Sequence, residues 1–173
     1  MQPIHISRRI LRPVRPWFIV LSMFAALLVN MIPLGHFPLM PDWVALVLVF
    51  WCIHQPFKVG MSAGFFLGIA MDVADGSVMG QHALAYVLLA YFAAGLSRRI
   101  LWFSMAQQSL HILPMLLGSQ LVMLAARMVS GGVFPGLTWL FSSLIGTLLW
   151  HPLNYVLLLP QFQPTERDEN RPI

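Results

Sequence analysis

Residues 60–80 read GMSAGFFLGIAMDVADGSVMG, and the rest of the chain can be interpreted outward from this stretch. A small or acidic residue recurs there at every fourth position: Gly60, Gly64, Gly68, Asp72, Gly76 and Gly80. Residues four apart in a helix lie nearly above one another, so glycines at this spacing leave a groove for a second backbone. The stretch therefore predicts a closely packed pair of helices.

The same period predicts where the first of these helices ends. Each step of four residues turns about 40° beyond one helical turn, so five steps drift by about 200°. One straight helix therefore cannot keep all six positions on one face. We expect Gly60, Gly64 and Gly68 to form the packing face, while Gly76 and Gly80 serve a turn and the start of the next helix.

The composition places this helix pair in a membrane. Of the 173 residues, 58% are hydrophobic and 9% are charged, whereas soluble domains carry about 25% charged residues. Apolar stretches follow one another along most of the chain, separated by short polar or Pro/Gly segments. The sequence thus predicts an all-α integral membrane protein, a bundle of six transmembrane helices. We expect helices at residues 17–33, 42–55, 60–72, 80–96, 105–128 and 137–159, with Pro114 kinking the fifth.

These helices define one membrane domain, at residues 17–160, between two polar ends. Residues 1–16 form an arginine-rich arm, expected to be cytoplasmic, and residues 161–173 form a polar tail of mixed charge. The arm and first helix resemble a signal peptide superficially. The apolar run is longer than a usual signal sequence, and no convincing small-x-small cleavage site follows it, so we expect the first helix to be retained.

The second and third predicted helices are short for membrane spans. About 15 residues rise only about 22 Å, against a hydrocarbon core of about 30 Å. Three arrangements fit this length: spans of a thinner membrane, a helix pair shielded by longer neighbours, or a re-entrant pair.

The distribution of basic residues predicts the orientation. With six spans and the N-terminus inside, Lys58, Arg98 and Arg99 fall in cytoplasmic turns, and nine of the ten Lys and Arg residues lie inside. The tenth, Arg127, lies near the outer end of the fifth helix, where its side chain can reach the headgroups. We therefore predict that both termini are cytoplasmic. Counting the second and third helices as one re-entrant element gives five spans and places the tail outside.

Three aspartates precede the polar tail, all of them near predicted helix ends or turns. Asp42, in the sequence Pro41-Asp42-Trp43, suits a helix N-terminus, and Asp75 suits a turn. Positions toward the outer face disfavour a proton relay, which normally lies nearer the bilayer centre.

Asp72 is less easily explained, because it replaces glycine within the period-four series. A carboxylate in an apolar helix needs a partner. Arg127 is the candidate, since it is expected at the same outer level.

The sequence carries no pattern typical of a cofactor site, a metal site or a catalytic centre. The histidines are scattered without i, i+4 pairing to an acidic ligand, and Cys52 is the single cysteine, in an apolar run. Nucleophile-elbow and phosphate-loop motifs are absent, and no basic patch suits nucleic acid. We expect a chain that is not an enzyme and that binds no metal, cofactor or nucleic acid.

Two groups of residues resemble the bacterial rod shape-determining MreD family. One is Pro41-Asp42-Trp43 followed by Phe50-Trp51, and the other is the glycine and aspartate series from Gly64 to Gly80. The similarity extends to chain length, number of spans, the arginine-rich start and the run Ala83-Leu-Ala-Tyr86, and it covers residues 17–160. The fifth and sixth helices match only in hydrophobicity and length. The first basic residue after them is Arg167, whereas relatives have a basic end beside the membrane.

The resemblance implies a non-enzymatic subunit of the bacterial inner membrane. Its family partner is MreC and, through MreC, the MreB filament, in a complex that contains RodA and a class B penicillin-binding protein. That complex directs lateral peptidoglycan synthesis, and lipid surrounds the subunit. We expect residues 39–43 and 72–80 to form the surface that meets MreC.

The family also resembles in fold the substrate-binding subunits of energy-coupling-factor transporters. This second resemblance implies an alternative function, a membrane subunit that binds a vitamin-type small molecule for uptake.

Overall fold

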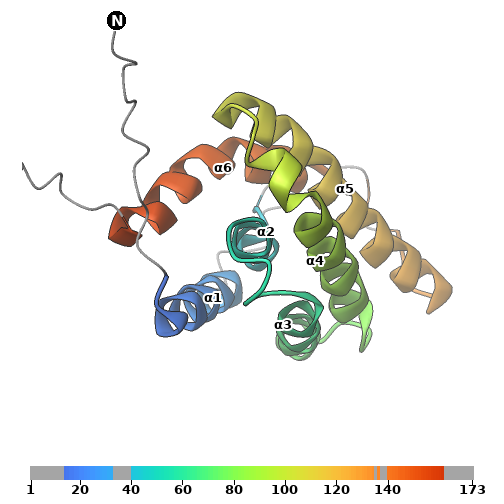
Figure 1. The fold of residues 1–173 in the computed structure, drawn as a ribbon. Helices are drawn as coiled ribbons and strands as arrows, with labels where there is room; N and C mark the ends of the chain where they lie inside the picture. Colours follow the sequence, from blue (N-terminus) through green and yellow to red (C-terminus); the bar gives the residue numbers. More distant parts are fainter. Residues whose placement is uncertain (1–13, 33–39, 135, 137–139, 162–173) are drawn as a thin grey trace, which may run out of the picture.

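The computed structural model of the chain describes residues 14–32, 40–134, 136 and 140–161 (Figure 1). Within these ranges the fold is all-helical, as predicted. Its elements are α1 (Pro16–Met31), α2 (Trp43–His54), α3 (Met61–Ala74), α4 (Gln81–Ile100), α5 (Met105–Val129), α6 (Phe141–Leu158) and the 3₁₀ helix η2 (Leu159–Gln161). Most of the predicted basic arm and polar tail lies outside the described residues.

Several helix boundaries differ from the predicted ones. Helix α4 continues to Ile100, so Arg98 and Arg99 lie in its last turn, where the helix dipole favours cations. Helix α3 continues past Asp72 to Ala74. Pro114 lies inside α5 and Pro152 inside α6, and both helices are assigned without a break.

Helix α2 is the centre of the bundle. In Figure 1 it lies end-on between α1, α4 and α6, and every residue from Val44 to Ile53 is buried. A helix that is apolar on all sides must be surrounded by protein or by lipid hydrocarbon, and here protein surrounds it. Phe50 and Trp51 fill the space on either side, with Phe50 beside Trp150 of α6 and Trp51 beside Phe18 of α1. The apolar sequence of α2 thus defines the core.

Of the three arrangements that the sequence left open, shielding by neighbouring helices describes α2 but not α3. Phe65, Phe66 and Val73 of α3 have 47%, 71% and 66% of their surface exposed. Three helices, α4, α5 and α6 extended by η2, are long and apolar enough to cross a membrane, whereas α1, α2 and α3 are shorter apolar helices. The bundle therefore combines three long helices with three short ones.

Helices α3 and α4 form the most extensive helix contact in the structure. A Cβ atom at Gly64 would lie 2.6 Å from the Tyr86 carbonyl oxygen, and one at Gly68 would overlap the backbone of Ala83. These two glycines let the backbones touch, and Ala83 is the matching small residue on α4. Gly60, predicted to share this face, has nothing within 4 Å of its Cβ position, so the close approach begins at Gly64.

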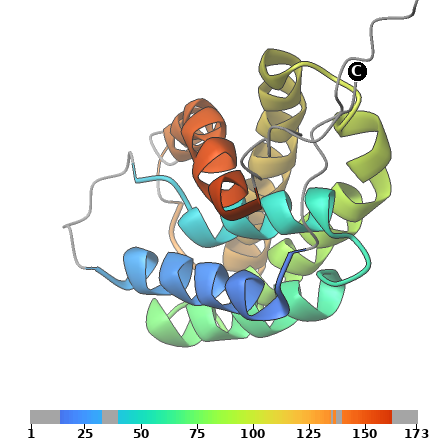
Figure 2. The same cartoon turned by 60° about the vertical axis from the view of Figure 1, so that its left-hand side comes forward.

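Successive helices run in opposite directions, as the turned view in Figure 2 also shows for the neighbouring helices α1 and α2. Asn30 at the end of α1 contacts Asp42 at the start of α2, and Lys58 after α2 donates to the carbonyl of Val14 before α1. Asp42 in turn contacts Tyr86 in the first half of α4. One end of the bundle thus collects the starts of α2 and α4 and the ends of α1 and α3, and the polar residues gather there.

Candidate functional site

The Asp72 carboxylate is buried at this end of the bundle and acts as the N-cap of a helix to which it does not belong. Helix α4 begins after Gly80, which has no side chain to cap it and has a φ of 96°. Asp72 of α3 accepts hydrogen bonds from the backbone N–H groups of Gly80 and His82, both at 2.8 Å, and of Ala83 at 3.5 Å. The first amides of a helix otherwise lack partners, so this carboxylate completes α4 and ties it to α3.

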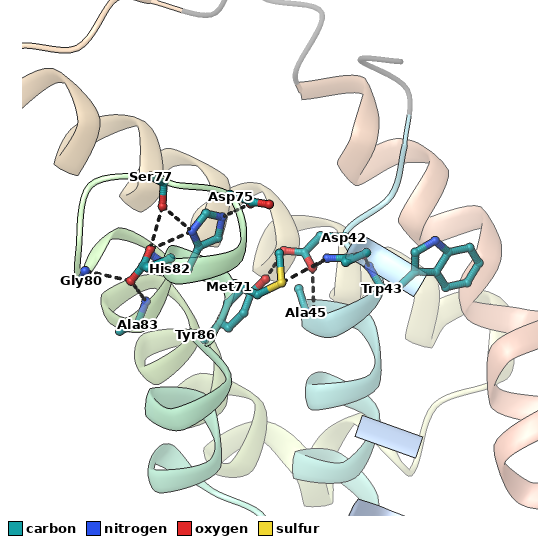
Figure 3. A network of polar contacts seen from close by, with 12 residues as sticks. Asp42, Trp43, Ala45, Met71, Asp75, Ser77, Gly80, His82, Ala83 and Tyr86 are labelled. Carbon is teal, nitrogen blue, oxygen red and sulfur yellow. Dashed lines mark hydrogen bonds and ion pairs between the residues drawn. The ribbon is translucent and has the colours of Figure 1, made fainter. Parts of the chain in front are cut away.

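His82 and Ser77 complete the surroundings of Asp72. The His82 Nδ1 atom lies 2.9 Å from Asp72 Oδ1, and the Ser77 hydroxyl donates to the same oxygen at 3.0 Å. The other ring nitrogen of His82, Nε2, lies 3.6 Å from Asp75 Oδ2. The imidazole therefore links the two aspartates that flank the end of α3 (Figure 3).

Asp42 forms a second polar centre beside the first. Its Oδ1 atom accepts from Ala45 N–H at 3.0 Å, the N-cap contact that its position before Trp43 predicted. The same oxygen accepts from Asn30 Nδ2 at 3.1 Å, and Oδ2 accepts from the Tyr86 hydroxyl at 2.7 Å. One carboxylate thus joins α1, α2 and α4.

The pairing expected between Asp72 and Arg127 is absent from the described residues. Asp72 is satisfied within the α3–α4 connection, and Arg127, in the last turn of α5, makes no ion pair in the described part of the chain. Gly132 packs closely against the Arg127 side chain instead. Nearby backbone N–H groups and the His82 imidazole therefore partner the Asp72 carboxylate, which the sequence had predicted to pair with the distant Arg127.

The remaining predicted residues lie either in the connection between α3 and α4 or inside the fold. Gly76 and Gly80 both have positive φ, at 59° and 96°, which glycine adopts without strain, and they shape the connection from α3 to α4. Pro41 is buried and Trp43 is half-buried, so both are used inside the fold. Exposed apolar surface in this region comes from Val73 in the last turn of α3 and from Val78 and Met79 in the connection to α4, which are 66%, 40% and 73% exposed.

A cavity of about 610 Å³ opens at this end of the bundle. Residues in or next to all six helices line it, including Asp42, Asp75, His82 and Arg127. The volume lies within the range of about 300–1,000 Å³ typical of small-molecule sites. The structure thus brings together acidic and basic residues that lie far apart in the sequence.

The pKa of Asp75, just after α3, lies above its ordinary value. Partial burial is the main cause, and the carboxylates of Asp42 and Asp72 add to it, whereas His82 opposes it. Its side chain is 46% exposed. Asp75 is therefore the aspartate of the cluster for which ionisation is disfavoured by its surroundings.

The chemistry of this cluster is structural. Within the described ranges no group of three His, Cys, Asp or Glu side chains could hold a metal ion. Both oxygens of Asp42 and of Asp72 accept hydrogen bonds inside the protein. The two carboxylates position helices, and neither is free to act on a substrate.

Sequence reasoning missed four of the polar partners: Asn30, Ser77, His82 and Tyr86. His82 and Tyr86 are one helical turn apart on α4 and face α3 and α2, a spacing visible in the sequence. Asn30 is the one amide in the predicted first helix, six residues before His36. A search for polar residues at the ends of apolar helices would have found both signals.

Comparison with known proteins adds the family. The model of the family described as rod shape-determining protein MreD matches residues 7–159. The chain belongs to the MreD family. The match includes all six α-helices and therefore the polar cluster and the cavity, and the family's description assigns it a role in determining rod shape.

A curated relative agrees with the MreD assignment. The rod shape-determining protein MreD of Haemophilus influenzae is 37% identical over 81 residues, which cover 45% of this chain and 50% of the relative. The aligned segment thus spans half the length of that protein. No solved structure matches the chain, so the predicted likeness of its fold to energy-coupling-factor subunits stays a prediction.

Proposed function

We propose that this chain is a non-enzymatic subunit of the bacterial inner membrane that helps the cell-elongation complex maintain rod shape. The family match across residues 7–159 is the observation that carries this proposal. Three helices long enough to cross a membrane support the location. In this role the protein crosses the membrane several times with both termini in the cytoplasm, and it helps couple MreC and the MreB filament to lateral peptidoglycan synthesis by RodA and a class B penicillin-binding protein.

The proposed contact surface for MreC is the last turn of α3 together with the connection to α4. The sequence predicted a surface formed by residues 39–43 together with 72–80. Residue 39 lies outside the described residues, and Pro41 and Asp42 are engaged inside the fold. Val73 and Met79 are exposed and apolar, while Asp72 and the positive-φ glycines hold the turn in one conformation. A rigid, exposed apolar turn suits recognition by a partner better than a flexible one, because less entropy is lost on binding.

The test of the shape role is depletion of the protein in a rod-shaped host that encodes it. We expect the cells to become round, and rescue by the intact gene should restore rods. Cells that remain rod-shaped throughout depletion would contradict the proposal.

The test of the surface is site-specific photocrosslinking in the native membrane. A crosslinker at Met79 or Val73 should capture MreC, whereas one at Leu148 of α6, which is 76% exposed, should not. Equal capture from Leu148 would argue against the turn as the contact surface.

A further inference from the structure

The cavity contains buried polar side chains that the protein itself does not satisfy. Gln81 at the start of α4, Gln120 of α5 and Ser142 of α6 line it, and each has only 6–7% of its surface exposed. Within the described part of the chain none of these side chains forms a hydrogen bond, and the Oε1 atom of Gln120 is buried without a partner. Buried polar groups in folded proteins are nearly always hydrogen-bonded, and an unpaired one costs about 1–3 kcal/mol.

Two opposite charges line the same cavity without pairing with each other. Asp75 comes from the α3–α4 connection and Arg127 from the end of α5, and no ion pair joins them in the described ranges. The other charged groups are already engaged, since Asp42 accepts from Tyr86 and Asn30, and both ring nitrogens of His82 face aspartates. Asp75 contacts His82 through one oxygen at 3.6 Å and its side chain is 46% exposed, so Asp75 and Arg127 can both still pair with a ligand.

From this arrangement we propose that the cavity binds a small zwitterion. Its cationic group pairs with Asp75, its anionic group pairs with Arg127, and its remaining polar groups form hydrogen bonds with the side chains of Gln81 and Gln120. A simple anion would face the Asp75 carboxylate, and a simple cation would face the Arg127 guanidinium. A molecule that carries both charges complements Asp75 and Arg127 together. The volume of about 610 Å³ accommodates a molecule of short-peptide size.

Two sources supply this chemistry. One is a free zwitterion of the amino-acid or peptide type. The other is the phosphoethanolamine headgroup of a membrane lipid, since the cavity opens at one end of the bundle. The inference is independent of the proposed shape role, because ligand binding is measured on the purified protein and the shape role by depletion in cells. Binding alone also does not make the chain an uptake protein.

The experiment is thermal unfolding of the purified full chain in a non-ionic detergent. The probes are triglycine for the free source and glycerophosphoethanolamine for the headgroup. N-acetyltriglycine amide, glycerol 3-phosphate and ethanolamine are the controls that lack one or both charges. We expect one zwitterion to raise the melting temperature by at least about 3 °C near 100 times its dissociation constant, and the controls to have no effect. The probe that acts identifies the source.

Variants of the lining test the geometry. Gln120→Leu should abolish the shift while leaving the melting temperature of the unliganded protein equal or higher, because it removes an unpaired buried polar group. Gln108→Leu, the same change on the same helix outside the cavity, should retain the shift. Arg127→Gln, at an exposed position, should raise the half-saturating concentration at least about tenfold.

Three results would overturn the inference. They are no shift with either zwitterion, an equal shift with the neutral peptide, or an undiminished shift in both Gln120→Leu and Arg127→Gln.

Discussion

At the scale of single residues, Asp72 shows how an aspartate is accommodated in an apolar helix. The cost of placing a carboxylate there is offset because it replaces the missing cap of the next helix and accepts from His82 and Ser77. Its period-four position follows from the same geometry, since Gly68 one turn earlier lies against Ala83, at the start of α4.

Removing this carboxylate should destabilise the fold. We expect Asp72→Ala to lower the free energy of unfolding by about 2–3 kcal/mol, because it leaves buried amides at the start of α4 without an acceptor. Asp75→Ala is the matched control, three residues away and half-exposed, and it should change the value by less than about 0.5 kcal/mol. Denaturant unfolding in detergent measures both, and equal losses would contradict the assigned role.

The raised pKa of Asp75 predicts a pH dependence of definite sign. An acid whose pKa is higher in the folded state favours folding while it is protonated, so this stability is lost as the pH rises through the folded-state pKa. This loss of stability begins near the pKa that Asp75 has in the unfolded chain and continues up to its higher pKa in the folded state. Asp75→Asn should remove this part of the pH dependence, and melting temperatures of both proteins across mildly acidic pH measure it. Parallel profiles would show that Asp75 titrates as it does in the unfolded chain.

At the scale of elements, α3 and α4 are held at their distance by glycine. Gly68→Ala places a Cβ atom against the Ala83 backbone, which cannot move as a flexible side chain would. We expect this variant to lower the free energy of unfolding by about 1–3 kcal/mol and to fail to restore rod shape, and Gly64→Leu to do so more severely.

Gly95→Ala is the matched control for this prediction, because its Cβ position on α4 has nothing within 4 Å. It should be neutral or stabilising by up to about 1 kcal/mol, as alanine favours a helix more than glycine does. If Gly68→Ala and Gly95→Ala behaved alike, close packing at Gly68 would not matter for the fold.

The sequence predicted the helices and the glycine contact because both depend on local patterns. Apolar runs predicted all six helices, and the spacing of Gly64 and Gly68 predicted the face that α3 presents. The partner of Asp72 was wrong, because a carboxylate at a helix end is as readily satisfied by backbone amides as by a distant charge. The cavity could not have been predicted, since Gln120 and Ser142 meet Asp75 there only through the packing of all six helices.

At the scale of the whole molecule, alternating helices bring both ends of the described chain to one end of the bundle. The proposed orientation places that end in the cytoplasm. It predicts that Phe57 and Trp102, which are 95% and 92% exposed, face the cytoplasm, and that Met79 and Val133, 73% and 80% exposed, face outward.

Cysteine labelling measures this orientation. In a Cys52→Ser background, cysteines at positions 79 and 133 should react with a maleimide that does not cross the inner membrane. Cysteines at positions 57 and 102 should react only after the membrane is permeabilised. The reverse pattern would show that the protein has the opposite orientation in the membrane. Labelling of position 57 together with position 79 would support a re-entrant pair.

The unequal helix lengths have a consequence for the surrounding bilayer. Helices α1 and α3, on one flank in Figure 1, rise about 24 and 21 Å, whereas α4 and α5 on the other rise about 30 and 37 Å. In the proposed multi-pass location the two flanks match different hydrocarbon thicknesses, so lipids beside α1 and α3 would compress or the whole bundle would tilt. Covering the short flank with another short-spanned protein would relieve that deformation. The bilayer's elasticity would thus favour assembly on the α1–α3 side before any specific contact forms.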